Sequence, residues 1–242
     1  IGNGPLSLAI IGDSHAGALF TYADEYLRNK SISAMTLSGA FCAPLLNGFE
    51  AAENCKDATK AAFDQIIKNQ NIRTIVLVAE WANYTKGFRD NDKPKSWKDS
   101  DGEAPSPSEN VNVFRRSLAK TLELLERHNK KVVIVHPVPE FPQAANNFIG
   151  RQLLWNVPIS FAISKLPSIS VKMYHERNSE VFSVFNEFKD KAQFFEVEGI
   201  FCEDKVCLQS NGDLPLYSDT NHLNYLGAKL LFDDLFRGIL GS

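Results

Sequence analysis

Residues 8–15 read Leu-Ala-Ile-Ile-Gly-Asp-Ser-His, an apolar run that ends in a polar turn. The run from Leu6 to Ile11 predicts a buried strand, and residues 16–29 carry apolar side chains at helical spacing. Ser14 therefore lies between a strand and a helix, where unpaired backbone N–H groups and the helix dipole favour negative charge. A serine at this place is either a helix N-cap or a nucleophile whose own N–H meets a developing oxyanion.

Apolar runs and helical patterns alternate along the rest of the chain. Further strands are predicted at residues 31–37, 73–79, 131–136 and 193–197, and further helices at 57–70, 113–128, 144–155, 170–188 and 225–236. The apolar run within residues 73–79 suits a parallel sheet that is covered on both faces. The alternation predicts an α/β protein, a three-layer α/β/α sandwich with a mainly parallel sheet, in a single domain over residues 1–242.

Candidate site residues follow the first three predicted strands. Ser14 follows the first strand, Gly39 the second and Trp81 the third. In parallel α/β sheets the ligand site lies outside the carboxyl ends of the strands. We therefore expect these three residues to lie at one edge of the sheet.

A second polar motif lies near the other end of the chain, where residues 218–223 read Ser-Asp-Thr-Asn-His-Leu. Asp219 can bond one ring nitrogen of His222 and leave the other nitrogen to face a nucleophile. A serine nucleophile needs a base and an acid that orients the base. Ser14, His222 and Asp219 supply these groups if the fold brings the chain ends together. The alternative is a surface turn that caps the last helix.

The composition is that of an ordinary globular protein, with 44% hydrophobic and 23% charged residues among 242. A formal net charge of −3 gives no electrostatic reason to expect nucleic acid as a partner. No apolar run approaches the roughly 20 residues of a membrane span. The first residues lack the basic start of a signal peptide, so we expect a mature form or a piece of a longer protein.

The four cysteines are Cys42, Cys55, Cys202 and Cys207. Their spacings match no zinc pattern, so no metal site is expected. The sequence-local pairing, Cys42 with Cys55 and Cys202 with Cys207, would pin two intervals that look like surface loops and would imply an oxidising compartment. The alternative is four buried free thiols in a cytosolic protein.

Residues 85–110 are rich in Lys, Asp, Ser and Pro, and they predict a long surface loop. Loops of this length are uncommon unless they are functional or mobile. Three aromatic residues in or near this stretch, Trp81, Tyr84 and Trp97, belong either to the core or to a surface that stacks on a sugar ring. The basic residues between Lys86 and Lys98 alternate with acids, which favours a solvated loop.

Taken together, these motifs resemble the SGNH/GDSL hydrolase family. The resemblance rests on Gly12-Asp13-Ser14 after the first strand, Gly39 after the second, and Asp219-Thr220-Asn221-His222 before the last helix, so it covers nearly the whole chain. It implies an SGNH/flavodoxin-like fold, with Ser14 as nucleophile, His222 as base and Asp219 as the acid that orients the base.

The resemblance also implies an oxyanion hole, and here the chain departs from the family pattern. The family's donors are the N–H of the nucleophilic serine, the N–H of the glycine that corresponds to Gly39, and an Asn side chain. The family's Gly-x-Asn-Asp after the third strand is absent, and residues 79–83 read Ala-Glu-Trp-Ala-Asn instead. Asn83 is displaced from the usual spacing, and the indole N–H of Trp81 is a rival donor.

Within this family the chain looks most like the SGNH domains attached to integral-membrane acyltransferases of the acyltransferase-3 family. The signs are Gly-Asp-Ser-His in place of Gly-Asp-Ser-Leu, the Cys202–Cys207 loop that leads to Leu216-Tyr217-Ser218-Asp219, and the segments at 80–84 and 136–140. This likeness implies a periplasmic domain of an inner-membrane protein.

Such a domain would transfer acetyl to a cell-envelope polysaccharide, for example the O-antigen of lipopolysaccharide. It would need no cofactor of its own, since an N-terminal membrane domain would supply the acetyl group. The alternatives are a carbohydrate acetyl esterase and a non-catalytic glycan-binding domain.

Overall fold

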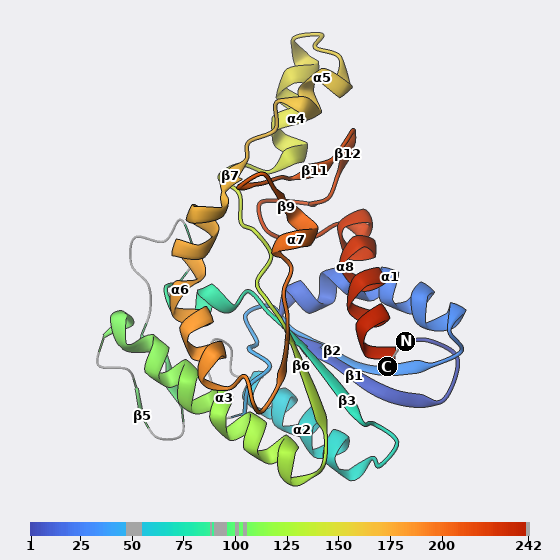
Figure 1. The fold of residues 1–242 in the computed structure, drawn as a ribbon, viewed down its shortest axis with the longest axis vertical. Helices are drawn as coiled ribbons and strands as arrows, with labels where there is room; N and C mark the ends of the chain where they lie inside the picture. The colour runs from blue at the N-terminus through green and yellow to red at the C-terminus, as the bar shows by residue number, and fades with distance from the viewer. Residues whose placement is uncertain (47–54, 88, 90–95, 100–101, 104–105, 241–242) are drawn as a thin grey trace. The chain divides into compact units, whose positions relative to one another are not determined.

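The computed structural model describes residues 1–46, 55–87, 89, 96–99, 102–103 and 106–240 (Figure 1). Contacts group the chain into two compact units. The sheet unit comprises Ile1–Gly17, Tyr26–Pro137 and Arg177–Phe195, and the second unit comprises Ala18–Glu25, Val138–Glu176 and Glu196–Ser242. The single domain over residues 1–242 stays a prediction.

The sheet unit is built on five parallel strands. They are β1 (Leu6–Gly12), β2 (Ser33–Ser38), β3 (Thr74–Val78), β6 (Lys131–Val135) and β8 (Gln193–Phe195). Their order is β2-β1-β3-β6-β8, and each neighbouring pair is parallel. The prediction of an α/β fold with a mainly parallel sheet is confirmed.

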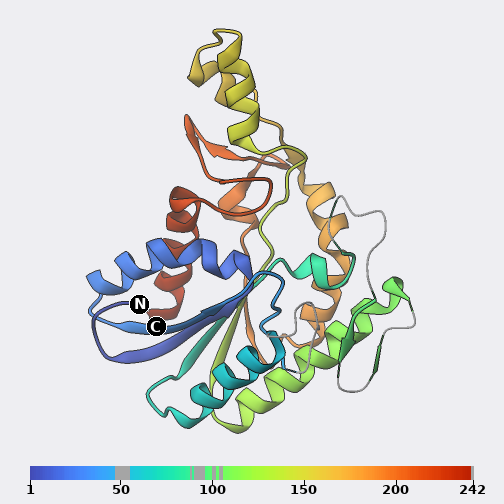
Figure 2. The same cartoon turned by 180° about the vertical axis from the view of Figure 1, so that it is seen from behind.

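Helices α2 (Cys55–Lys68) and α3 (Asn110–Arg127) cover one face of this sheet, together with the later turns of α6 (Val171–Glu187) (Figure 2). Phe63 of α2, Phe114 of α3 and Phe185 of α6 are buried in the same apolar cluster. Each such side chain contributes about 1.5–3 kcal/mol when it leaves water. The connection from β1 to β2 contains α1 (Ser14–Asn29), whose middle residues, Ala18–Glu25, belong to the second unit.

The second unit combines short strands with helices. A three-stranded antiparallel sheet has the order β7-β10-β9, and β11 pairs with β12. The elements are α4 (Ala145–Leu154), α5 (Ile159–Ser164), β7 (Ile169–Ser170), α7 (Glu198–Phe201), β9 (Cys202–Glu203), β10 (Val206–Cys207), β11 (Ser210–Asn211), β12 (Leu214–Pro215) and α8 (Tyr225–Leu240).

Within the second unit, α8 packs on the middle of α1 through one tyrosine. The ring of Tyr22 lies edge-on to Tyr225 and Phe232, with ring centroids 5.4 and 6.3 Å away. Its hydroxyl donates a 2.6 Å hydrogen bond to Asp233, which also pairs with Lys229 at 2.8 Å. Edge-on ring contacts and a polar anchor thus fix the register of the two helices.

Both predicted disulfides are present, so the free-thiol alternative is wrong. Cys55 is the first residue of α2, while the predicted surface loop before it falls, at residues 47–54, outside the described residues. Cys202 and Cys207 staple the β9–β10 hairpin, whose turn residues Asp204 and Lys205 have positive φ angles of 48° and 70°. Such angles match the twist of a tight hairpin.

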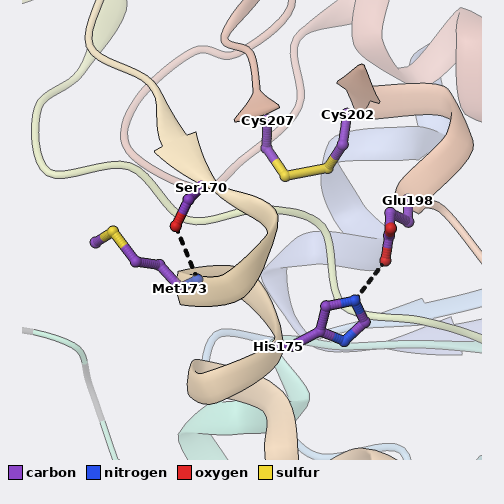
Figure 3. The surroundings of a disulfide bond; sticks show 6 residues. All are labelled: Ser170, Met173, His175, Glu198, Cys202 and Cys207. Carbon is purple, nitrogen blue, oxygen red and sulfur yellow. Dashed lines mark hydrogen bonds and ion pairs between the residues drawn. A yellow bond between two sulfur atoms is a disulfide. The ribbon is translucent and has the colours of Figure 1, made fainter. Parts of the chain in front are cut away.

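Figure 3 shows this hairpin disulfide beside the start of α6. The hydroxyl of Ser170 accepts the backbone N–H of Met173 at 3.1 Å, which satisfies one of the orphan donors of the first turn. One turn further on, His175 Nε2 lies 2.7 Å from a carboxylate oxygen of Glu198 in α7 (Figure 3). The pair ties α6 to the segment that leads into the disulfide.

The described part of the stretch 85–110 contains short elements and one buried aromatic side chain, and the long surface loop over the whole stretch stays a prediction. The stretch includes a short hairpin, β4 (Lys98–Asp99) and β5 (Gly102–Glu103), and the 3-10 turn η2 (Pro107–Glu109). Trp97 is buried, its backbone N–H donates to Asn110 Oδ1 at 2.8 Å, and its ring lies 6.0 Å from that of Tyr84. Residues 88, 90–95, 100–101 and 104–105 lie outside the described residues.

Candidate active site

The turn after β1 is shaped by a close approach of backbone to backbone. A Cβ added to Gly12 would lie 1.7 Å from the carbonyl oxygen of Val78 and 2.6 Å from Cβ of Ala16, so only glycine fits. Asp13 follows in extended conformation as the N-cap of α1, and Ser14 is the first helical residue. Ser14 therefore lies at the positive end of a sixteen-residue helix, as the sequence predicts.

Asp13 joins this turn to the segment after β3. The side chain is 2% exposed, and its carboxylate accepts three hydrogen bonds of 2.9 Å. The donors are the backbone N–H groups of His15 and Glu80 and the hydroxyl of Tyr84. A buried carboxylate with three donors is a fixed anchor. It holds the backbone on which Ser14 is carried.

Tyr84 is the matching half of this anchor, and sequence reasoning gave it no such role. Burial raises the pKa of Tyr84 well above its usual value, and the neighbouring charge of Asp13 raises it further. The phenol is therefore protonated near neutral pH and donates to the carboxylate. The available signal in the sequence was the preference for Asp at N-caps, which does not name the partner.

Three strands end together at the edge that carries Ser14. Gly12 of β1 pairs with Ser38 of β2 and with Val78 of β3. The next residues of these strands lead to Ser14, to Gly39 and to the 3-10 turn η1 (Trp81–Tyr84). The prediction that these residues share one edge is confirmed. The chain order reverses between β1 and β3, and ligands bind α/β sheets at such switch points.

Gly39 lies in a turn that the first disulfide holds. Its carbonyl oxygen accepts the backbone N–H of Cys42 at 3.0 Å, and a Cβ at Gly39 would lie 2.8 Å from Cys42 Sγ. Because that sulfur is bonded to Cys55, it is not free to swing aside. The bridge therefore fixes the segment that carries Gly39. The role of the Gly39 N–H as an oxyanion donor stays a prediction.

The structure contradicts the prediction that Trp81 is an oxyanion donor. Its side chain is fully buried, and its single N–H donates to the carbonyl oxygen of Val135 at 2.8 Å. The ring packs against Phe114 and Phe185, with centroids 5.9 and 5.7 Å away. A buried indole whose only donor is engaged cannot meet an oxyanion. Tyr84 and Trp97 are buried too, so the sugar-stacking alternative for these three aromatic residues is wrong as well.

Asn83 lies in the same turn and is 1% exposed. Its backbone N–H donates to Glu80 at 2.9 Å, and its carbonyl oxygen accepts the N–H of Gly87 at 3.2 Å. Within the described residues, its side-chain oxygen Oδ1 is buried without a hydrogen-bond partner. A buried amide with unused capacity is uncommon and calls for a functional or structural reason. Its role as third oxyanion donor stays a prediction.

The second motif is an ordered turn in the second unit. Asp219 Oδ2 lies 2.6 Å from His222 Nδ1, while Oδ1 accepts the backbone N–H groups of Asn221 and His222 at 2.9 and 2.7 Å. The N–H of Ser218 donates to the carbonyl oxygen of His222, and that of Phe141 to Thr220, at 2.9 and 2.7 Å. The predicted contact between Asp219 and His222 is confirmed.

The ionised carboxylate of Asp219 decides which ring nitrogen of neutral His222 carries the proton. Burial alone would raise the pKa of Asp219, but the hydrogen bonds from the His222 ring and from two backbone N–H groups outweigh it and hold the pKa well below its usual value. An ionised carboxylate only accepts, so Nδ1 of neutral His222 carries the proton that it donates to Asp219. The other nitrogen, Nε2, is then an acceptor, which is the tautomer that a general base requires.

The predicted site residues thus fall into two groups. Ser14, Gly39 and Asn83 belong to the sheet unit, whereas Asp219 and His222 belong to the second unit. The complete triad of Ser14, His222 and Asp219 stays a prediction. Among the residues that the structure describes, no cluster of three His, Cys, Asp or Glu side chains could hold a metal ion.

Comparison with known proteins assigns both motifs to one family model. The model of the family described as "SGNH domain (fused to AT3 domains)" matches residues 1–236, a range that includes Ser14, Asp219 and His222. No curated protein matches the sequence.

Solved structures share the fold at low sequence identity. The periplasmic domain of a lipopolysaccharide acetyltransferase from Salmonella ser. Paratyphi A aligns with a TM-score of 0.67 and 18% identity, over 99% of this chain and 84% of that chain. The carbohydrate acetylesterase Est24 from Sinorhizobium meliloti gives 0.50 and 12%, over 99% of each chain. The inhibitor-bound aryl esterase of M. Smegmatis gives 0.55 and 10%, over 98% and 99%.

Proposed function

The chain belongs to the family of SGNH domains that are fused to AT3 domains, and from this premise we propose that it transfers an acetyl group to a hydroxyl of a cell-envelope polysaccharide. The observation that carries the proposal is the 2.6 Å contact between Asp219 Oδ2 and His222 Nδ1, which prepares the imidazole as a base. Ser14, at the switch point of the sheet and the start of α1, is the proposed nucleophile.

The proposed reaction has two halves. In the first, His222 Nε2 takes the proton of Ser14 Oγ as this oxygen attacks the acetyl carbonyl carbon. The tetrahedral intermediate collapses, the donor's leaving oxygen takes that proton back from His222, and an acetyl ester on Ser14 remains. In the second half, His222 takes the proton of the acceptor hydroxyl, whose oxygen attacks the ester. Ser14 then leaves and recovers the proton.

The negative charge on the tetrahedral oxygen needs fixed donors. The backbone N–H groups of Ser14 and Gly39 are proposed for this role, with the side-chain amide of Asn83 as the third donor. The anchor at Asp13 and the Cys42–Cys55 bridge support the proposal, because both hold the turns that carry these groups. Loss of one such donor typically lowers the rate by about 10²–10³-fold.

The identity of the acceptor distinguishes a transferase from an esterase. Transfer to a polysaccharide is favoured by the AT3 fusion that defines the family, and the similar Salmonella domain is a periplasmic domain of a lipopolysaccharide acetyltransferase. The two disulfides support an oxidising compartment, and hence a periplasmic domain of an inner-membrane protein. In that arrangement the AT3 domain delivers acetyl groups, and this domain needs no cofactor.

The proposal is tested by offering the purified chain an acetyl donor, p-nitrophenyl acetate, with and without an O-antigen oligosaccharide. We expect acetylated oligosaccharide, identified by mass spectrometry. The Ser14→Ala variant should form it at least about 10⁴-fold more slowly. The matched control Ser108→Ala removes an exposed hydroxyl that bonds to Ser106, and it should match the wild type.

Two other results contradict the proposal in different ways. Release of acetate at the same rate with and without oligosaccharide, and no acetylated sugar, would identify an esterase. Binding of the oligosaccharide without turnover of any ester would identify a glycan-binding domain. Circular dichroism of each variant shows whether the fold is retained.

A further inference from the structure

Helices α4 and α5 form a hairpin (Figure 1). Large apolar side chains are exposed at its end. Among the described residues ten large hydrophobic side chains are exposed, and five of them fall within residues 153–161. Leu154 and Trp155 are 82% and 81% exposed. We call the five the hairpin tip: Leu153, Leu154, Trp155, Ile159 and Phe161. Such a concentration marks an interaction surface, whereas single exposed apolar residues are ordinary.

The hairpin tip is held in place by ordered structure. Asn156 follows α4 in the left-handed conformation with φ 54°, and the backbone N–H of Val157 donates to the carbonyl oxygen of Gln152 at 3.2 Å. The hairpin has a small core of its own, made by Ala145, Ile149, Ala162 and Ile163. The inner faces of both helices are used for this core. The five side chains of the hairpin tip lie outside this core and are 46–82% exposed.

The charged residues in the sequence around the hairpin tip, residues 141–175, have one sign. Residues 141–175 contain no Asp or Glu, although the chain average of 29 acidic residues in 242 would put about four in a stretch of this length. The charged side chains of the stretch are Arg151, Lys165 and Lys172. Lys165 Nζ lies 5.4 Å from the ring centre of Phe161 at the tip. A chain of net charge −3 thus carries a locally basic, apolar end.

We propose that the hairpin tip inserts into the interfacial region of a bilayer that contains anionic phospholipid. Trp prefers the headgroup level, and Leu, Ile and Phe gain by entering the acyl boundary. Arg151 and Lys165 complement the negative headgroups, and the stretch has no carboxylate to repel them. Charge complementarity and the exposed Trp favour a bilayer over a protein partner. The proposal does not depend on the acetyl transfer proposed above.

Binding can be measured with the chain itself and vesicles of stated composition. One set contains phosphatidylethanolamine and phosphatidylglycerol, and the other contains phosphatidylcholine alone. We expect the protein to float with the anionic vesicles and to bind the neutral ones more weakly. Among the three Trp residues, Trp81 and Trp97 are buried, so a blue shift of the fluorescence on binding reports Trp155.

Variants separate the apolar and charged contributions. Leu154→Ser and Trp155→Ser should each lower the partition coefficient roughly tenfold. Replacing Arg151 and Lys165 by Gln should lower binding to anionic vesicles about fivefold each and leave binding to neutral vesicles unchanged. Leu154 and Trp155 are so exposed that their loss should leave the circular dichroism spectrum unchanged. The matched control Leu214→Ser, an exposed leucine of β12, should bind like the wild type.

Three results would overturn the proposal. The first is that the wild type fails to float with anionic vesicles. The second is that the tip variants bind these vesicles as tightly as the wild type does. In the third, analytical ultracentrifugation without lipid shows self-association that depends on Trp155, which would assign the hairpin tip to a second copy of the chain.

Discussion

Two aspartates position the groups that the proposed chemistry uses, and their surroundings differ. Asp13 is buried, and its three hydrogen bonds fix a backbone turn. The side chain of Asp219 is 48% exposed, and it orients a single imidazole. A buried carboxylate destabilises the fold unless both of its oxygens accept hydrogen bonds, whereas an exposed carboxylate can accept hydrogen bonds from water. Substitution at the two sites should therefore act differently.

Asp219→Asn should lower kcat for acetyl transfer by roughly 10³–10⁴-fold. Because Oδ1 accepts two backbone N–H groups, the Asn side chain keeps its oxygen there and presents its NH2 group to His222 Nδ1. Nδ1 must then accept, so the ring proton moves to Nε2, which no longer serves as the base. Initial rates with p-nitrophenyl acetate and oligosaccharide check this. The control Asp213→Asn changes an exposed aspartate in the turn between β11 and β12 and should leave kcat unchanged. Equal rates for wild type and Asp219→Asn would remove Asp219 from the mechanism.

The same substitution has a defined pH signature in stability. Because the pKa of Asp219 is lowered in the folded state, its contribution is fully present above the ordinary aspartate pKa, about 3.9, and is lost as the pH falls through the lower folded value. Near neutral pH, we expect the free energy of unfolding to be roughly 1 kcal/mol higher for the wild type than for Asp219→Asn. The difference is small because solvent screens this half-exposed carboxylate. The difference in urea-unfolding free energy should shrink only below about pH 4. A difference that grows toward acid pH would contradict the assignment.

Tyr84→Phe should lower the free energy of unfolding by about 1.5–3 kcal/mol, because it removes a buried hydrogen bond to a charged acceptor. Urea unfolding measures the change. Tyr225→Phe is the matched control, since it removes an exposed hydroxyl that donates to Glu25, and it should cost less than about 1 kcal/mol. A similar loss of unfolding free energy in both variants would show that the buried hydrogen bond to Asp13 stabilises the fold no more than an exposed one.

The sequence predicts the residue types of the candidate site better than their environments. Ser14, Asp219 and His222 could be named because strand ends and an Asp-x-x-His spacing are local patterns. The burial of Trp81 depends on Phe114 and Phe185, which come from other helices. Its indole N–H is occupied by a carbonyl group of β6. No local pattern contains that information. The same holds for Tyr84, whose partner Asp13 is distant in sequence.

At the scale of elements, the turn after β2 depends on a covalent bridge. Replacing Cys42 and Cys55 by Ser should cost about 3 kcal/mol of stability, and replacing Cys202 and Cys207 about 2 kcal/mol, because the bridges span 13 and 5 residues. Only the first pair holds the turn that carries Gly39. We therefore expect kcat to fall about 10²-fold for the first double variant and to change little for the second.

Thermal unfolding and initial rates, measured on the same samples, check this prediction. An equal fall in kcat for both double variants would mean that the loss follows general stability. An unchanged kcat for the Cys42/Cys55 double variant would show that oxyanion stabilisation does not depend on the turn that carries Gly39.

Long elements could be predicted from the sequence, whereas short ones could not. The strands of the sheet and helices such as α3 have several apolar residues in register, so their periodicity is strong. α5, α7 and the two-residue strands of the second unit are too short to show a period. Their backbone is set by partners distant in sequence, as when β10 pairs with β7. The hairpin β4–β5 was hidden by the polar composition of its stretch.

Across the whole sheet, the strand order explains why the proposed nucleophile lies at a switch point. Alternation along the sequence predicted parallel strands but not the order β2-β1-β3-β6-β8. That order places the switch point beside β1, where Ser14 lies, and this is where an α/β sheet opens to ligands. No helix among the described residues is both long and apolar enough to cross a membrane.

The proposed mechanism requires Ser14 to carry the acetyl group, and intact-mass spectrometry of an acid-quenched reaction detects that group. With p-nitrophenyl acetate and no acceptor, the wild type should gain the mass of one acetyl group. Peptide mapping should place that group on Ser14, and added oligosaccharide should remove it. Ser14→Ala should gain none, and Ser108→Ala should behave like the wild type. An acetyl group found at another residue, or an equal gain in Ser14→Ala, would contradict the account.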